Sequence, residues 1–254
     1  MNRRAILALL PGIICLAVAS AASAKELAEI EDELSAQWDK VSAYSAKIEM
    51  KGQSLRGATN VEISGKGTLE GMKKNASMVY RLELDQTLTM GESAMPNKML
   101  VVHDGTGMFT QTSMMGQTMV FKSKADKQSQ IVSPGGREAF KQMHEQYDIK
   151  VLPGDNLNGE PVYVFELRPK QDAEKQSNAA GKPQFDKTLL SLSRKTGFPI
   201  RMLMFGQEET PLMTVDYRDY KIDPKLDPAR FTYTPPPGAV VMDAETFKQM
   251  GGTP

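Results

Sequence analysis

Residues 78–121 have the sequence MVYRLELDQTLTMGESAMPNKMLVVHDGTGMFTQTSMMGQTMVF, and this stretch decides the fold. Its first part alternates apolar with charged side chains, a period typical of a strand with one buried face. The apolar positions are Tyr80, Leu82, Leu84, Leu88 and Met90. Two more strands are expected at 98–103 and 108–112, joined by a turn whose glycines tolerate positive φ. Because no catalytic motif occurs here, the question is what this apolar face covers.

The first 24 residues have the pattern of a secretory signal peptide. A basic start is followed by an apolar segment and by the small residues Ala22-Ser-Ala24. We predict cleavage after Ala24, with Ala17-Val-Ala19 as an alternative site, and export to the periplasm. An uncleaved anchor helix is disfavoured because Pro11 interrupts a segment already short for a span of about 20 residues. The rest, 25–254, is expected to form one domain.

Composition excludes several classes of protein. The only cysteine, Cys15, lies within the predicted signal peptide, so the mature chain has no disulfide, thiol nucleophile or thiolate ligand. The chain has 31 basic and 31 acidic residues. This balance gives no electrostatic footprint for nucleic acid or for an anionic membrane surface. Because the mature chain has no disulfide, its stability must come from burial of a core. We expect a monomer without a cofactor.

Two amphipathic helices are expected. The first covers 25–41 and carries an apolar stripe at helical spacing: Leu27, Ile30, Leu34, Trp38 and Val41. The second covers 137–147, with Phe140, Met143, His144 and Tyr147 at i, i+3, i+4 and i+7. Short helices are expected within 124–131 and at 244–250. The first stripe ends in the only tryptophan, whose large surface must be covered.

The remaining elements are strands. They are expected at 44–51, 61–70, 149–152, 162–167, 188–194, 199–205 and 211–222, with a charged loop at 169–186. Strands that follow one another without helices favour an antiparallel meander. Nine to eleven strands in one sheet usually curl. We therefore predict an α+β fold, a curved antiparallel sheet whose concave face is filled by the helices.

Three segments resemble the LolA family of periplasmic lipoprotein carriers. The closing segment Phe231-Thr-Tyr-Thr-Pro-Pro-Pro-Gly238 is similar to the family's F-x-F-x-P-P-x-G, Val101-Val-His-Asp-Gly-Thr-Gly-Met-Phe109 to its V-x-D-G hairpin, and Gly65-Lys-Gly-Thr-Leu69 to its G-R-G-x-L strand. The three occur in the family's order, and the resemblance spans nearly all of the mature chain.

The resemblance implies an unclosed β-barrel with helices over an apolar cavity for lipoprotein acyl chains. It also implies an inner-membrane ABC transporter as donor and an outer-membrane receptor as acceptor. The family's gating arginine would correspond to Lys66, which cannot make the forked hydrogen bonds of arginine. Alternation also places Lys66 with the polar set of its strand. A paralogue with another lipidic ligand therefore stays open.

Seven methionines lie between Met90 and Met119. Methionine fills irregular gaps in a core and also makes an adaptable wall for a variable acyl chain. A third interpretation is copper(I) binding through thioethers, which soft-ligand preference allows for Met114, Met115 and Met119. The strand methionines have the spacing of packing residues, so we favour packing or a lipid wall.

Enzymatic chemistry has little support. The sequence has no G-x-S-x-G elbow, H-E-x-x-H pair or P-loop. Of the two histidines, His103 is expected to bond locally at its turn, and His144 to pack on its helix. We therefore expect no enzyme activity and no catalytic residues.

The preferred hypothesis is a periplasmic carrier that holds acyl chains between the sheet and the helix at 25–41. The residues expected to line its cavity are Leu27, Ile30, Leu34, Trp38, Leu82, Leu84, Leu88, Met90, Met202 and Met204. Alternation identifies a buried face but cannot distinguish a hollow cavity from a filled core. An envelope sensor or protein-interaction module without cargo is the alternative.

Overall fold

The computed structural model describes residues 16–56, 59–74, 77–124, 136–170 and 185–249. Its helices are α1 (Leu16–Trp38), α2 (Arg137–Gln146) and α4 (Ala244–Gln249), with the 3-10 helices η2 (Gln207–Glu209) and η3 (Pro228–Phe231). Its strands are β1 (Ala43–Arg56), β2 (Thr59–Lys74), β3 (Ser77–Met90), β4 (Ser93–His103), β5 (Gly107–Met114), β6 (Gln117–Lys124), β7 (Tyr147–Leu157), β8 (Glu160–Pro169), β9 (Lys187–Ser193), β10 (Pro199–Phe205), β11 (Pro211–Ile222) and β12 (Val240–Asp243).

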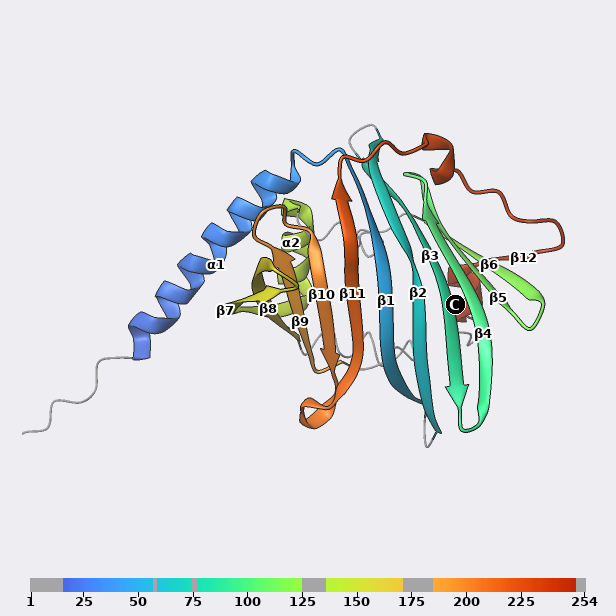
Figure 1. The fold of residues 1–254 in the computed structure, drawn as a ribbon, viewed down its shortest axis with the longest axis horizontal. Helices are drawn as coiled ribbons and strands as arrows, with labels where there is room; N and C mark the ends of the chain where they lie inside the picture. Colours follow the sequence, from blue (N-terminus) through green and yellow to red (C-terminus); the bar gives the residue numbers. More distant parts are fainter. Residues whose placement is uncertain (1–15, 57–58, 75–76, 125–135, 171–184, 250–254) are drawn as a thin grey trace, which may run out of the picture.

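The strands form one twelve-stranded sheet with the order β12-β6-β5-β4-β3-β2-β1-β11-β10-β9-β8-β7. Every pairing is antiparallel except that of β12 with β6. The sheet curves so that its two edges, β7 and β12, lie apart and unpaired with each other (Figure 1). The predicted α+β class and unclosed antiparallel sheet are confirmed. The helix expected within 124–131 lies outside the described residues apart from its first position, as does most of the loop expected at 169–186.

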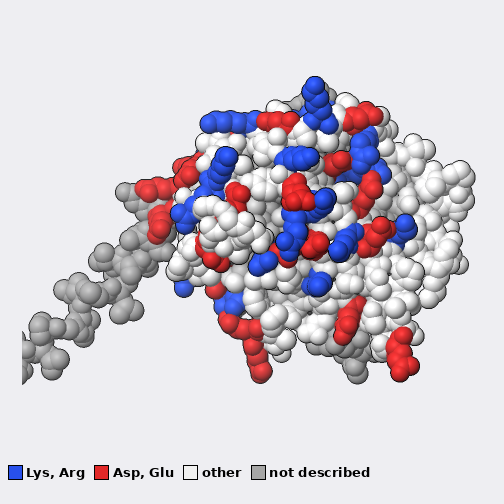
Figure 2. Space-filling view, viewed as in Figure 1, with Lys and Arg blue, Asp and Glu red and all other residues white. Residues whose placement is uncertain are grey.

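Strand register gives the sheet two chemically different faces. Tyr80, Leu82, Leu84 and Leu88 share one face, and we call this the inner face because the helices pack against it. The opposite, outer face carries rows of charged side chains of both signs (Figure 2). Several of these form cross-strand ion pairs, such as Arg201–Asp216 at 2.6 Å and Arg218–Glu49 at 2.9 Å. Alternation in the sequence therefore becomes an apolar inner face and an outer face that is charged over much of its area, although Val79, Val102 and Val120 on its β3–β6 part are buried.

Helix α1 covers the β7–β10 part of the inner face. Its Ile30 and Leu34 are buried in a cluster with Phe140 of α2 and with Phe165, Leu167, Leu190 and Leu192 of the sheet. We call this cluster the helix-covered core. Among the described residues no helix combines the length and apolar character needed to cross a membrane.

The observed α1 differs from the predicted helix at both ends. It begins at Leu16 and continues through the predicted cleavage position, which stays a prediction. It ends at Trp38, where the backbone N–H groups of Lys40 and Val41 donate to carbonyls three residues earlier (3.2 and 3.0 Å). Such bonds tighten the last turn and satisfy carbonyls that the helix leaves free. The expected end at Val41 was therefore wrong by one turn.

The second buried cluster is aromatic. Trp38 lies 5.6 Å from Tyr44 and 6.3 Å from Phe198 between ring centroids, and Phe198 stacks on Tyr220 at 4.9 Å. This aromatic core joins α1 to β1, β2 and β3. Trp38, the only tryptophan in the sequence, is thus covered by Tyr44 and Phe198.

A glycine makes room for this cluster. A Cβ atom on Gly71 would lie 2.3 Å from the ring of Tyr44, so the inner side of β2 must lack a side chain at that point. The glycines of 61–70 and their neighbour Gly71 thus mark close approach, as glycine within a strand indicates.

Candidate functional site: an apolar inner face with a cavity beneath α2

A cavity of about 260 Å³ lies between α2 and the inner face of the sheet. Helix α2 contributes one wall and β7–β11 contribute most of the other. The lining residues are Leu69, Ala139, Gln142, Met143, Gln146, Tyr147, Leu167, Phe185, Thr188, Leu190, Pro199, Met202, Met204 and Tyr217. The lining is mostly apolar, and burial raises the pKa of both tyrosine hydroxyls, Tyr147 and Tyr217. Its volume is slightly smaller than the range of about 300–1,000 Å³ that is typical of small-molecule sites.

The residues predicted to line the cavity fall into three groups. Met202 and Met204 do line it. Ile30, Leu34 and Trp38 are almost fully buried, with at most 7% of their surface exposed, and Leu27 packs beside them. Leu82 and Leu84 belong to the aromatic core, whereas Leu88 and Met90 lie farther along the inner face. Thus α1 fills the concave face rather than roofing a cavity, and α2 is the roof.

The residues of α2 that roof the cavity, Gln142, Met143 and Gln146, were not among those predicted to line it. Their helix and its apolar stripe were predicted, but its place over β8–β10 depends on contacts distant in sequence. The one available signal was the stripe itself, because an amphipathic helix must cover something.

Helix α2 is held against α1 by polar contacts. His144 Nε2 lies 2.9 Å from Glu31 Oε1, and an Arg137 guanidinium nitrogen lies 3.3 Å from an Asp32 carboxylate oxygen. On its other side, α2 is tied to the end of β8: the ammonium of Lys170, the residue after β8, donates to the His144 carbonyl at 2.6 Å. The packing role expected for His144 was therefore wrong: its ring is 46% exposed and joins the two helices.

His103 also differs from expectation. Its ring is buried, stacks on Tyr80 at 5.3 Å, and places Nδ1 3.1 Å from the Met78 carbonyl. The Asp104 carboxylate instead accepts from the backbone of Thr106 and Gly107, which closes the turn. The local bond expected between His103 and its turn is thus replaced by a cross-strand contact.

The β3–β6 part of the inner face is lined by methionines. Six of the seven methionines between residues 90 and 119 share this face: Met90, Met95, Met99, Met108, Met114 and Met119. Three of them, Met90, Met114 and Met119, keep 36–39% of their surface exposed. We call this region the methionine half. The same face also carries Gln86, Asn97, Thr110 and Thr112, and it is only partly covered by described residues.

The three methionines considered for copper(I) do not share one environment. Met114 and Met119 lie on the inner face, but Met115 lies in the β5–β6 turn with positive φ and is 76% exposed. Within the described ranges, no cluster of three or more His, Cys, Asp or Glu side chains could hold a metal ion.

Lys66 lies on the outer face. In register it stands between Glu49 of β1 and Asp85 of β3, and its ammonium is 3.5 Å from the Glu49 carboxylate. The side chain is 80% exposed. The position that corresponds to the family's gating arginine therefore points away from the apolar face.

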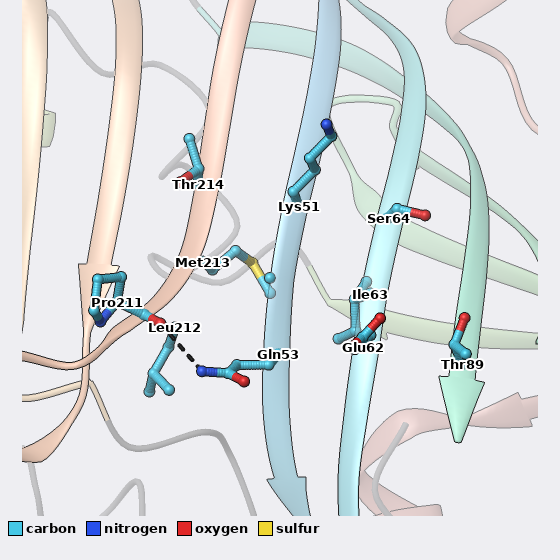
Figure 3. Close-up of a pocket in the computed structure, with 11 residues that line it drawn as sticks. Lys51, Gln53, Glu62, Ile63, Ser64, Thr89, Pro211, Leu212, Met213 and Thr214 are labelled. Carbon is cyan, nitrogen blue, oxygen red and sulfur yellow. Dashed lines mark hydrogen bonds between the residues drawn. The ribbon is translucent and has the colours of Figure 1, made fainter. Parts of the chain in front are cut away.

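A second hollow, of about 370 Å³, lies near the ends of β1, β2, β3 and β11. Its side chains include Lys51, Gln53, Glu62 and Thr89, spread along neighbouring strands without converging on one point (Figure 3). Gln53 Nε2 donates to the Pro211 carbonyl at 3.4 Å, which ties β1 to β11. The polar, divergent lining does not define a site.

No protein-family model matches the sequence, and no curated protein matches it. Solved structures are similar in fold. An uncharacterized conserved protein from Thermus thermophilus has 11% identity and a TM-score of 0.49, covering 86% of this chain and 99% of that one. Lipoprotein LppX from Mycobacterium tuberculosis has 10% identity and a TM-score of 0.42, and the match covers 78% of this chain and 98% of that one. A putative outer membrane lipoprotein-sorting protein domain from Vibrio parahaemolyticus has 11% identity and a TM-score of 0.35, and the match covers 80% of this chain and 95% of that one. Because these values are low, we derive function from the inner face itself.

Proposed function

We propose that this chain is a periplasmic carrier that holds the acyl chain of a lipid or lipoprotein against its inner face. The observation that carries the proposal is the methionine half, a methionine-rich surface continuous in register with the cavity beneath α2. Each methylene moved from water to such a surface contributes about 0.8 kcal/mol. Binding by apolar contact needs no charged anchor and no bond chemistry, which suits a protein that must release its cargo.

Methionine suits this role because its unbranched side chain adapts to irregular ligands. The cavity beneath α2 would take the end of the chain, and the methionine half the remainder. In the role that the family resemblance implies, cargo would arrive from an inner-membrane ABC transporter and leave to an outer-membrane receptor.

The test is native mass spectrometry of protein purified from the periplasm, followed by removal of lipid and addition of hexadecanoic acid. A lipid adduct is expected in the first step. Ligand at about one hundred times its Kd should stabilise the fold by about 2.7 kcal/mol and raise the melting temperature by about 5–10 °C.

A matched pair of variants locates the site. Met204→Glu places a charge in the cavity and should abolish the thermal shift, because burying an unpaired carboxylate against an acyl chain is unfavourable. Met115→Glu makes the same change in the exposed turn and should leave the shift intact. Absence of both adduct and shift in the unsubstituted protein would reject the carrier and favour a module without cargo.

A further inference from the structure

One cross-strand row of the inner face contains polar groups. From the cavity it passes through Met202, Val215, Met50 and Gly65, which are successive register partners on β10, β11, β1 and β2. It continues through Gln86 of β3, Asn97 of β4 and Met114 of β5. From Met202 to Asn97 the row crosses five strand spacings of about 4.8 Å, or about 24 Å along the curved face.

The amides in this row are hydrogen bonded to one another. Asn97 Nδ2 donates to Gln86 Oε1 at 3.0 Å, and Gln86 Nε2 donates to Met50 Sδ at 3.3 Å. A Cβ atom on Gly65 would lie 3.1 Å from side-chain carbons of both Met50 and Gln86. Glycine at this position leaves the space in which the two side chains meet.

The sulfur fixes the orientation of both amides. A thioether accepts but cannot donate, so the Gln86 NH₂ group must face Met50 and its oxygen must face Asn97. Asn97 must then present its NH₂ group to Gln86. The remaining oxygen, Asn97 Oδ1, is thereby turned away from the hydrogen-bonded chain.

Asn97 Oδ1 is buried and has no hydrogen-bond partner among the described residues. A buried acceptor left unsatisfied is unfavourable, because it has lost its hydrogen bonds to water and gained none in the protein. Its register neighbours on this face are Met95, Met99 and Met114, none of which has a donor. Their flexible side chains can rearrange to admit a ligand.

We propose that Asn97 Oδ1 accepts a hydrogen bond from the head end of the bound acyl lipid, so that the face prefers acyl chains carrying a donor, an amide N–H or a hydroxyl. The inference rests on the proposed function, since it assigns the class of that same cargo. A chain with its tail in the cavity would place its head end along this row. A donor there satisfies an oxygen that an ester-only lipid leaves unpaired.

The experiment compares three probes that share a sixteen-carbon chain, by displacement of a fluorescent fatty acid from the lipid-free protein. Hexadecanamide offers N–H donors, hexadecan-1-ol offers a hydroxyl, and methyl hexadecanoate offers no donor. The unsubstituted protein should bind at least one donor probe about five- to tenfold more tightly than the ester. Which donor probe is preferred distinguishes the amide from the hydroxyl.

Asn97→Leu should remove this preference and leave the affinity for the ester within about twofold. Asn156→Leu, the same change at an exposed position of β7, should retain it. If Asn97→Leu fails to fold, the ranking of probes by the unsubstituted protein still decides the matter. Equal binding of all three probes, or tighter binding of the ester, would overturn the inference while the carrier function stands. Binding of none would reject the carrier function.

Discussion

The two halves of the inner face differ in how their apolar surface is covered. In the helix-covered core, Leu34 and Leu192 are 0% exposed and Phe165 is 1% exposed, under α1 and α2. In the methionine half, Met90, Met114 and Met119 are each more than a third exposed. Both halves arise from the same strand alternation, yet only the first is a completed core.

This difference separates stability from binding. Side chains in the closed half gain their full transfer energy and dispersion contacts in the folded protein itself. Side chains in the open half retain apolar surface that a ligand can still remove from water. A sheet with twelve strands, of which α1 and α2 cover only one part, thus supplies both a core and a binding surface.

The largest expected effect comes from truncating one apolar side chain in each half. Phe165→Ala should lower the free energy of unfolding by about 3–5 kcal/mol, because the cavity it leaves is enclosed. Met114→Ala should cost less than about 2 kcal/mol, because Met114 is already 36% exposed in the folded protein. Urea unfolding measures the loss of unfolding free energy in each variant, provided that the m-value is unchanged. Equal losses would show that the methionine half is packed as tightly as the core.

A smaller effect is expected where the halves meet. Gly71→Ala places a Cβ atom against the Tyr44 ring and should destabilise the fold by about 1–3 kcal/mol through overpacking. Combining it with Tyr44→Leu should cost less than the sum of the single changes, since the smaller side chain removes the clash. Additive losses in this double-mutant cycle would contradict the close contact.

Alkaline pH tests the burial of Tyr44 in the aromatic core. Burial raises the pKa of Tyr44 well above its ordinary value of 10.0. Above about pH 10 the unfolded chain therefore releases a proton that the folded protein keeps, so stability is retained below this pH and falls as pH rises. Tyr44 should contribute about 1.4 kcal/mol of loss per pH unit. In Tyr44→Phe the slope of unfolding free energy against pH should be shallower by that amount; an unchanged slope would argue against burial of the hydroxyl.

The smallest effect is expected on the outer face. Lys66→Ala removes an exposed pair and should change the unfolding free energy by less than about 0.5 kcal/mol. Affinity for hexadecanoic acid should stay within twofold, because Lys66 lies on the face opposite the methionines. A loss of affinity much greater than this would restore a gating role to this position.

Much of the fold could be predicted from local pattern. Alternation between residues 78 and 90 identified β3 and its buried side, and the stripe Phe140–Met143 identified α2. Strand β12 was not predicted, because four residues paired in parallel with a strand more than a hundred positions earlier leave no local signal. The candidate site was predicted in part: Met202 and Met204 were expected, but the place of α2 above them was not.

Local pattern in the chain is enough to assign the apolar side chains and the strand faces they share, because a period of two is a local property. Which part of that shared face is covered depends on contacts between elements that are far apart in the sequence. Helix α1 could have covered any of these strands equally well by its stripe alone. Its contacts with Phe165 and Leu190, and the row that brings Gln86 to Met50, depend on strands brought together from distant positions. Whether a side chain of the inner face is buried depends on the elements that pack against it, and the order of the strands and the placement of the helices decide which elements those are.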